Sequence, residues 1–169
     1  MACQLIYSTN DLFAESLLKT ISFKKTGYGS LKEGIKLVKD FWEQRGLTTN
    51  QLFMTDGSGL SRSNTVTTSY LAKLLSKIYK DKNLYDIINN SFPVAGKSGS
   101  LANLCKNSFA ENNLRAKSGY INRARGYAGY FKSKSGKDLC FAVLFNNYNC
   151  SASEAKQKIE KLLIAFTEL

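Results

Sequence analysis

The segment Leu139-Cys-Phe-Ala-Val-Leu-Phe145 limits the possible folds more than any other part of this chain. It has the length of a β-strand and is apolar at every position, so both of its faces must be covered in the folded protein. Such a strand usually takes a central position in a sheet. The sequence therefore predicts a β-sheet with packing elements on both sides.

Two other strand-like runs precede this segment, at 114–121 and 126–132, and the third strand is expected over 139–147. Ser135-Gly136 lies between the last two runs and is a hairpin signal, which makes these strands antiparallel. The predicted sheet therefore contains at least three antiparallel strands.

Apolar residues at helical spacing predict four helices before the strands and one after them. The first begins at Ser8 or Asn10, and the last begins at the capping box Ser151-x-x-Glu154. Residues 55–64 are rich in glycine and turn formers, which favours a loop. The helices are expected near 10–21, 31–45, 67–78, 84–88 and 151–166. We expect an α/β protein of the α+β type, folded as a single domain over residues 1–169.

The chain contains no histidine, which excludes a Ser-His-Asp triad. An activated serine would need a lysine amine or another hydroxyl group as its base. Ser8-Thr9-Asn10 followed by Lys117-Ser118-Gly119 fits the pattern Ser-x-Asn and Lys-(Ser/Thr)-Gly, which belongs to lysine-dependent serine chemistry. Each triplet also has a plainer interpretation, as an N-cap and as an exposed strand lysine respectively.

The third element of this pattern, the nucleophile in Ser-x-x-Lys, should precede the other two. The three matches, at Ser16, Ser22 and Ser153, all follow Ser8, and a chain this rich in serine and lysine contains such matches by chance. Gly96-Lys97-Ser98-Gly99 resembles the end of a phosphate-binding loop, but Ser91 stands where that motif requires glycine. The sequence therefore predicts a lysine-dependent serine site without its nucleophile, and no nucleotide site.

Several segments, in order, resemble the class C low-molecular-mass penicillin-binding proteins, the D-alanyl-D-alanine carboxypeptidase/endopeptidase family. The loop Asp56–Asn64 is the most specific of them. Lys117-Ser118-Gly119 is similar to the family's Lys-Thr-Gly strand, with serine in place of threonine. The resemblance covers about residues 8–147 and is carried by Ser8–Glu15, Asp56–Asn64, Pro93–Leu101, Lys117–Gly119 and Gly126–Tyr130.

This resemblance implies a β-lactamase/transpeptidase-like fold that is incomplete at its N-terminal side. It also implies the role of each site residue. Ser8 would relay a proton toward the leaving group, and Asn10 would orient the substrate. Lys117 and Ser118 would bind the substrate carboxylate, Gly119 would let the substrate backbone approach, and the Tyr120 N–H would form half of the oxyanion hole.

By the same resemblance, the chain is the C-terminal part of a serine-type D-Ala-D-Ala carboxypeptidase acting on peptidoglycan stem peptides. It would also bind β-lactams and act in the periplasm or cell envelope. The missing nucleophile predicts that the chain is inactive alone, and the alternative is a non-catalytic module that binds peptidoglycan peptides. Strands that normally flank strand 139–147 would be missing, so we expect this strand to pair with a second copy or to associate in another way, which sedimentation would detect.

Composition adds further limits. The formal net charge is +11, but the basic residues are dispersed and form no nucleic-acid motif, which argues against a nucleic-acid partner. Four cysteines without C-x-x-C spacing and without histidine predict no metal, and no cofactor is expected. The first residues lack the charge and apolar length of a signal peptide, and no stretch approaches 18 apolar residues.

Overall fold

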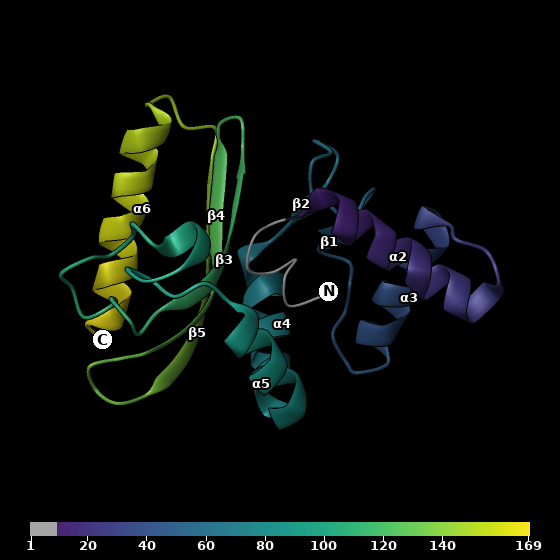
Figure 1. The fold of residues 1–169 in the computed structure, drawn as a ribbon, viewed down its shortest axis with the longest axis horizontal. Helices are drawn as coiled ribbons and strands as arrows, with labels where there is room; N and C mark the ends of the chain where they lie inside the picture. Colours follow the sequence, from purple (N-terminus) through teal and green to yellow (C-terminus); the bar gives the residue numbers. More distant parts are fainter. Residues whose placement is uncertain (1–9) are drawn as a thin grey trace.

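The computed structural model describes residues 10–169 as an α+β arrangement (Figure 1). Three longer strands are preceded by four helices and followed by one, which confirms the predicted order. The helices are α2 (Asp11–Thr26), α3 (Leu31–Glu43), α4 (Thr68–Lys80), α5 (Lys82–Ser91) and α6 (Ala152–Thr167), with a 3-10 turn, η1, at Gly99–Leu101. The strands are β1 (Leu52–Phe53), β2 (Thr65–Val66), β3 (Arg115–Ile121), β4 (Ala124–Lys132) and β5 (Asp138–Asn146).

The main sheet has the order β3-β4-β5, and both pairs are antiparallel. In the register of β3 with β4, Lys117 lies opposite Ala128 and Ser118 lies opposite Tyr127. Gly136 lies in the β4–β5 turn with φ +82°, a conformation that glycine adopts readily. The expected antiparallel hairpin is confirmed.

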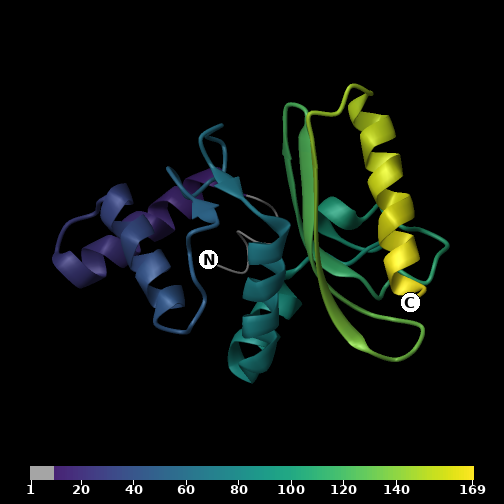
Figure 2. The same ribbon diagram turned by 180° about the vertical axis from the view of Figure 1, so that it is seen from behind.

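Helices cover both faces of this sheet. Figures 1 and 2 show α6 along one face and α4 against the other, with α2 and α3 beyond α4. The main core lies under α6, where Leu163 is wholly buried with Tyr127 and Phe141. A smaller cluster of Leu75, Phe92 and Tyr130 lies on the α4 face. Burial of these side chains stabilises the sheet from both sides, as the apolar segment at 139–145 predicts.

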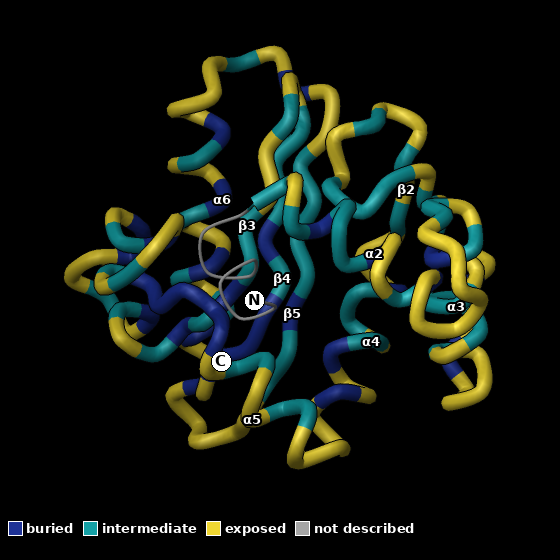
Figure 3. Tube along the Cα trace, turned by 45° about the vertical axis from the view of Figure 1, so that its right-hand side comes forward, coloured by how far each residue is buried: buried dark blue, intermediate teal, exposed yellow. Residues whose placement is uncertain are grey.

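In the described part of the chain, β5 is an edge strand, although a strand that is apolar at every position usually lies at the centre of a sheet. The edge position agrees with the expectation, drawn from the family resemblance, that the strands flanking 139–147 are missing. Leu12 and Phe41 belong to the apolar stripes at helical spacing that predict α2 and α3, but the two residues are 73% and 40% exposed. Figure 3 shows the corresponding contrast between the sheet, whose residues are mostly of intermediate exposure with some buried, and the more exposed α2–α3 pair. Helical periodicity defines an apolar stripe, but it cannot show whether another element covers that stripe.

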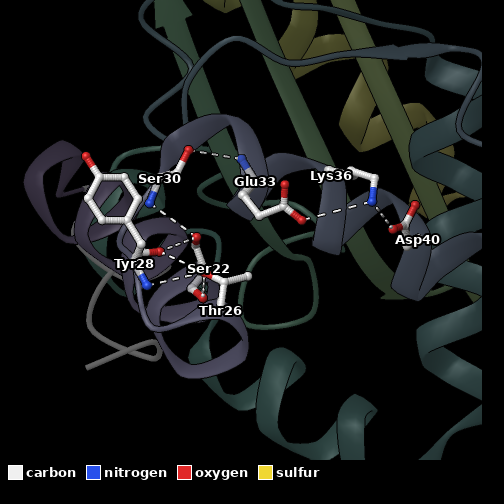
Figure 4. Close-up of polar contacts among 7 residues, drawn as sticks. All are labelled: Ser22, Thr26, Tyr28, Ser30, Glu33, Lys36 and Asp40. Carbon is white, nitrogen blue, oxygen red and sulfur yellow. Dashed lines mark hydrogen bonds and ion pairs between the residues drawn. The ribbon is translucent and has the colours of Figure 1, made fainter.

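The turn between α2 and α3 gives Ser22 a structural role (Figure 4). Its side chain is completely buried, its hydroxyl donates to the Tyr28 carbonyl oxygen at 2.7 Å, and it accepts from the Ser30 N–H at 3.2 Å. Ser30 in turn caps α3 by accepting from the Glu33 N–H at 3.3 Å. Ser22 therefore holds the two helices together, which agrees with the interpretation of this Ser-x-x-Lys match as coincidental.

Candidate active site

Lys117 and Ser118 project from opposite faces of β3 because successive side chains alternate along a strand. Lys117 lies opposite Ala128, which packs against the cluster on the α4 face. Ser118 lies opposite Tyr127, which belongs to the main core under α6. The strand therefore offers a cation on one face and a hydroxyl group on the other.

Within residues 10–169, strand pairing covers the outer edge of β3 only at its beginning. The Ala116 N–H donates to the Pro93 carbonyl oxygen at 3.1 Å, and Val94 forms an isolated bridge with Arg115. Among residues 10–169, no other strand pairs with this edge beyond Ala116. Because N–H groups alternate in direction along a strand, those of Ser118 and Tyr120 point outward like that of Ala116. An extended peptide could add to this part of the edge as a further strand.

A cleft with a volume of about 700 Å³ lies between the sheet and α4, and Lys117, Ser118, Gly119 and Tyr120 of β3 border it. The other walls come from α4, from β4 and β5, and from the segment that contains β1 and β2. A Cβ atom added at Gly119 would meet no atom within 4 Å. The glycine therefore leaves room for a ligand backbone beside the strand.

The amine of Lys117 lies in a partly buried environment. It donates to the Ser118 carbonyl oxygen at 2.5 Å. Burial lowers the pKa of Lys117 below that of an ordinary lysine, while the negative charge of Asp11 acts in the opposite direction. This electrostatic coupling joins the first residue of α2 to β3, although 106 positions separate the two residues in the sequence.

This coupling predicts the effect of an Asp11→Asn substitution. Removing the carboxylate charge should lower the pKa of Lys117 further, because the protonated amine loses a favourable interaction. The measurement is an NMR pH titration of the Lys117 ε-methylene signals. Asp86→Asn, which removes an exposed carboxylate from α5, should leave the titration unchanged. A Lys117 pKa that rises or stays constant in Asp11→Asn would contradict the coupling.

Asn10 is placed at the start of α2. Its side-chain oxygen accepts from the Phe13 N–H at 3.1 Å, so the residue caps the helix. This geometry agrees with the plainer interpretation of the Ser8-Thr9-Asn10 triplet and still leaves the side-chain amide group to act as a donor. Ser8, the other candidate in the triplet, lies outside the described residues.

The loop at 56–64 packs directly on α2. The Glu15 carboxylate accepts from the N–H groups of Gly57 and Ser58, both at 3.0 Å. A Cβ atom at Gly57 would lie 2.8 Å from the Ala14 carbonyl oxygen, so only glycine permits this close approach. Two segments that carry the family resemblance are therefore in contact. Sequence spacing gives no signal for the role of Glu15.

Asp56 organises the same loop. Its carboxylate accepts from the N–H groups of Gly59 and Ser61, at 2.6 and 2.8 Å, and from the side-chain amide of Asn64 at 2.8 Å. Burial acts to raise the pKa of Asp56, but the hydrogen bonds to Asn64, Gly59 and Ser61 together outweigh it and lower the pKa below its ordinary value. The loop is therefore stabilised by an ionised aspartate and is preformed at the border of the cleft.

Ser100 is a second residue near the site that sequence reasoning did not single out. The Ser118 hydroxyl donates to the Ser100 hydroxyl oxygen at 2.7 Å. The two residues are 18 positions apart, and no spacing rule connects η1 with β3. The structure thus places Lys117, Ser118, Gly119 and Tyr120 at one cleft. The start of α2 is linked to them through the charge of Asp11, whereas Asn10 is not among the residues that line the cleft.

Comparison with protein families identifies the family of this chain. A family model described as the D-Ala-D-Ala carboxypeptidase 3 (S13) family matches residues 3–168. The chain belongs to this S13 family. The resemblance inferred from the motifs is therefore confirmed, and S13 membership makes the chain related to penicillin-binding proteins and serine peptidases.

Individual relatives agree with S13 membership. A D-alanyl-D-alanine carboxypeptidase of Actinomadura sp. is 32% identical over 88% of this chain and 28% of that protein. Another, DacB of Haemophilus influenzae, is 25% identical over 92% of this chain and 33% of that protein. The chain therefore spans about a third of the length of the curated relatives it matches.

Solved structures confirm the fold. Penicillin binding protein 4 of Haemophilus influenzae matches with a TM-score of 0.89 at 22% identity, covering 99% of this chain and 39% of that one. A complex of that protein with a β-lactam matches with a TM-score of 0.82 at 25% identity, covering 95% and 38% of the two chains. TLA-3 extended-spectrum β-lactamase matches with a TM-score of 0.74 at 14% identity, covering 98% and 62%. The predicted β-lactamase-like fold is confirmed.

Three further properties concern only residues 10–169. No cluster of three or more potential metal-binding side chains occurs in this range. None of its helices is both long and apolar enough to cross a membrane. Cys105, Cys140 and Cys150 are free thiols, and burial, the largest cause, raises the pKa of Cys105 to about 12.

Proposed function

We propose that the chain is the C-terminal part of a serine-type D-Ala-D-Ala carboxypeptidase that acts on peptidoglycan stem peptides in the periplasm or cell envelope. It supplies the part of the site that recognises the peptide carboxylate. The observation that carries this proposal is the edge of β3 after Ala116, which no described strand covers and where Lys117, Ser118 and Gly119 border the cleft. In this proposal residues 1–169 form part of one transpeptidase-like domain.

The chemistry of this edge fits a peptide that ends in a carboxylate. Both residues border the cleft, so a carboxylate at the edge of β3, between its two faces, would reach the positive charge of the Lys117 amine and the hydrogen-bond donor of the Ser118 hydroxyl. The outward N–H of Tyr120 can donate to a peptide carbonyl oxygen and would stabilise an oxyanion if a nucleophile attacked there. In this proposal, Asn10 orients the substrate from the start of α2, and Ser8 relays a proton to the leaving group.

Peptide binding tests this proposal. An N-acetylated peptide ending in D-Ala-D-Ala should bind the chain in calorimetry, and its C-terminal amide should bind at least about tenfold more weakly, because it lacks the charge recognised by Lys117. Lys117→Met should remove most of this discrimination. Lys137→Met, which removes an exposed charge from the β4–β5 turn, is the matched control. Equal affinity for acid and amide would contradict the proposal.

A non-catalytic peptide-binding module is the second candidate. None of the serines at 16, 22 and 153 borders the cleft, so no described Ser-x-x-Lys match is placed to act as the nucleophile there. Both candidates share the same binding site and differ only in whether another segment supplies a nucleophile. An in-frame Ser-x-x-Lys encoded upstream of Met1 would favour the peptidase.

Pairing of β5 with a second copy stays a prediction.

A further inference from the structure

Ser118 occupies the position at which the related Lys-Thr-Gly strand carries threonine. Threonine is β-branched, which restricts rotation about χ1, whereas serine populates its three rotamers more freely. A hydroxyl group that must meet a ligand in one orientation loses precision when that restriction is removed. A serine at this position therefore needs another interaction to fix its rotamer.

The structure provides that interaction through Ser100. The Ser118 hydroxyl donates to the Ser100 hydroxyl oxygen at 2.7 Å, a normal distance for a bond between two hydroxyl groups. Ser118 borders the cleft, whereas Ser100 is not among the cleft-lining residues. Any effect of Ser100 on a ligand in the cleft would therefore act through Ser118.

The backbone around Ser100 is held firmly. Leu101 is wholly buried in the main core, and its carbonyl oxygen accepts from the Gly96 N–H at 3.0 Å. On the other side, the Ser98 hydroxyl accepts from the Val94 N–H at 3.0 Å. Both contacts anchor η1 to the segment that pairs with the start of β3. Ser100 is thus a fixed partner for Ser118.

We propose that Ser100 is a positioning residue that replaces the rotamer restriction lost with threonine at position 118. This inference rests on the proposed function, in which Ser118 meets the peptide carboxylate. In the empty site, the Ser100 hydroxyl oxygen accepts a hydrogen bond from the Ser118 hydroxyl. When a carboxylate binds, the Ser118 hydroxyl rotates to donate its hydrogen bond to the carboxylate, and the Ser100 hydroxyl donates a hydrogen bond to the Ser118 oxygen. A hydroxyl group can make both arrangements because it has one donor and two acceptor sites.

A double-mutant cycle with the D-Ala-D-Ala peptide tests this role. Ser100→Ala should weaken binding about fivefold, the scale of one hydrogen bond. The same change in a Ser118→Thr background should weaken binding less than twofold, because threonine already restricts the rotamer. Ser100→Thr, which keeps the hydroxyl group, should retain affinity, and Ser153→Ala on α6 is the control. No loss in Ser100→Ala, or an equal loss in both backgrounds, would overturn the inference.

A second measurement needs no ligand and therefore separates this inference from the proposed function. The NMR couplings between the α and β protons of Ser118 should show one dominant rotamer in the original chain and averaging in Ser100→Ala. If the peptide does not bind but the couplings change, the proposed function fails and the rotamer control stands. Unchanged couplings in Ser100→Ala would refute the role of Ser100 whether or not the peptide binds.

Discussion

Labelled penicillin should form no covalent adduct with this chain. Acylation requires a nucleophile beside Lys117, and the serines of the three Ser-x-x-Lys matches do not border the cleft. Ser22 in particular is completely buried and uses its hydroxyl in the α2–α3 turn. Loss of the nucleophile in a serine hydrolase lowers turnover by about a millionfold, so labelling should stay at background.

Mass spectrometry of the intact protein after incubation with the label measures this result. A full-length D-alanyl-D-alanine carboxypeptidase treated in parallel shows that the label is reactive. A stoichiometric adduct on any serine of this chain would show that a nucleophile is present after all, and peptide mapping would identify it.

Among glycine-to-alanine substitutions in the sheet, Gly129→Ala should produce the largest loss of stability. A Cβ atom at this position would lie 2.0 Å from the Arg115 carbonyl oxygen and 2.6 Å from the Ala116 Cα atom. Both neighbours are backbone atoms of β3, which cannot rotate away as a flexible side chain can. The strand must shift, and we expect a loss of about 3 kcal/mol in the free energy of unfolding.

Gly119→Ala is the matched comparison for Gly129→Ala, because it adds the same methyl group to the same sheet where no atom lies within 4 Å. Its midpoint of chemical denaturation should remain close to that of the original chain, whereas that of Gly129→Ala should fall clearly. Equal midpoints would mean that β3 and β4 are not packed as closely as the structure indicates. The same shift of β3 would also displace Lys117 and Ser118 and weaken peptide binding.

Most of the fold could be predicted because the pattern of apolar residues identifies the strands of the main sheet and the helices that pack on it. The continuous apolar run at 139–145 required cover on both faces, and α4 and α6 provide it. Ser151-x-x-Glu154 predicted the start of α6, and the capping box is present. The two-residue strands β1 and β2 were not predicted because such short pairs have no periodicity.

Fewer of the site residues could be predicted from the sequence. The triplet at 117–119 identified one wall, because a lysine, a hydroxyl and a glycine in a strand form a recognisable pattern. The contributions of Asp11, Glu15 and Ser100 depend on contacts between segments far apart in the chain, and spacing within one segment carries no information about these contacts. Leu12 shows the same limit for packing, since its helical stripe predicted burial and its side chain is 73% exposed.

In the proposed complex, the peptide carboxylate lies along β3, within electrostatic range of Asp11 at the start of α2. The most direct test is amide chemical-shift mapping by NMR while the D-Ala-D-Ala peptide is added. We predict that the largest changes occur at Ser118, Gly119 and Tyr120, together with Asp11 at the start of α2. Changes confined to α6 or to the α2–α3 turn, with β3 unaffected, would contradict the account.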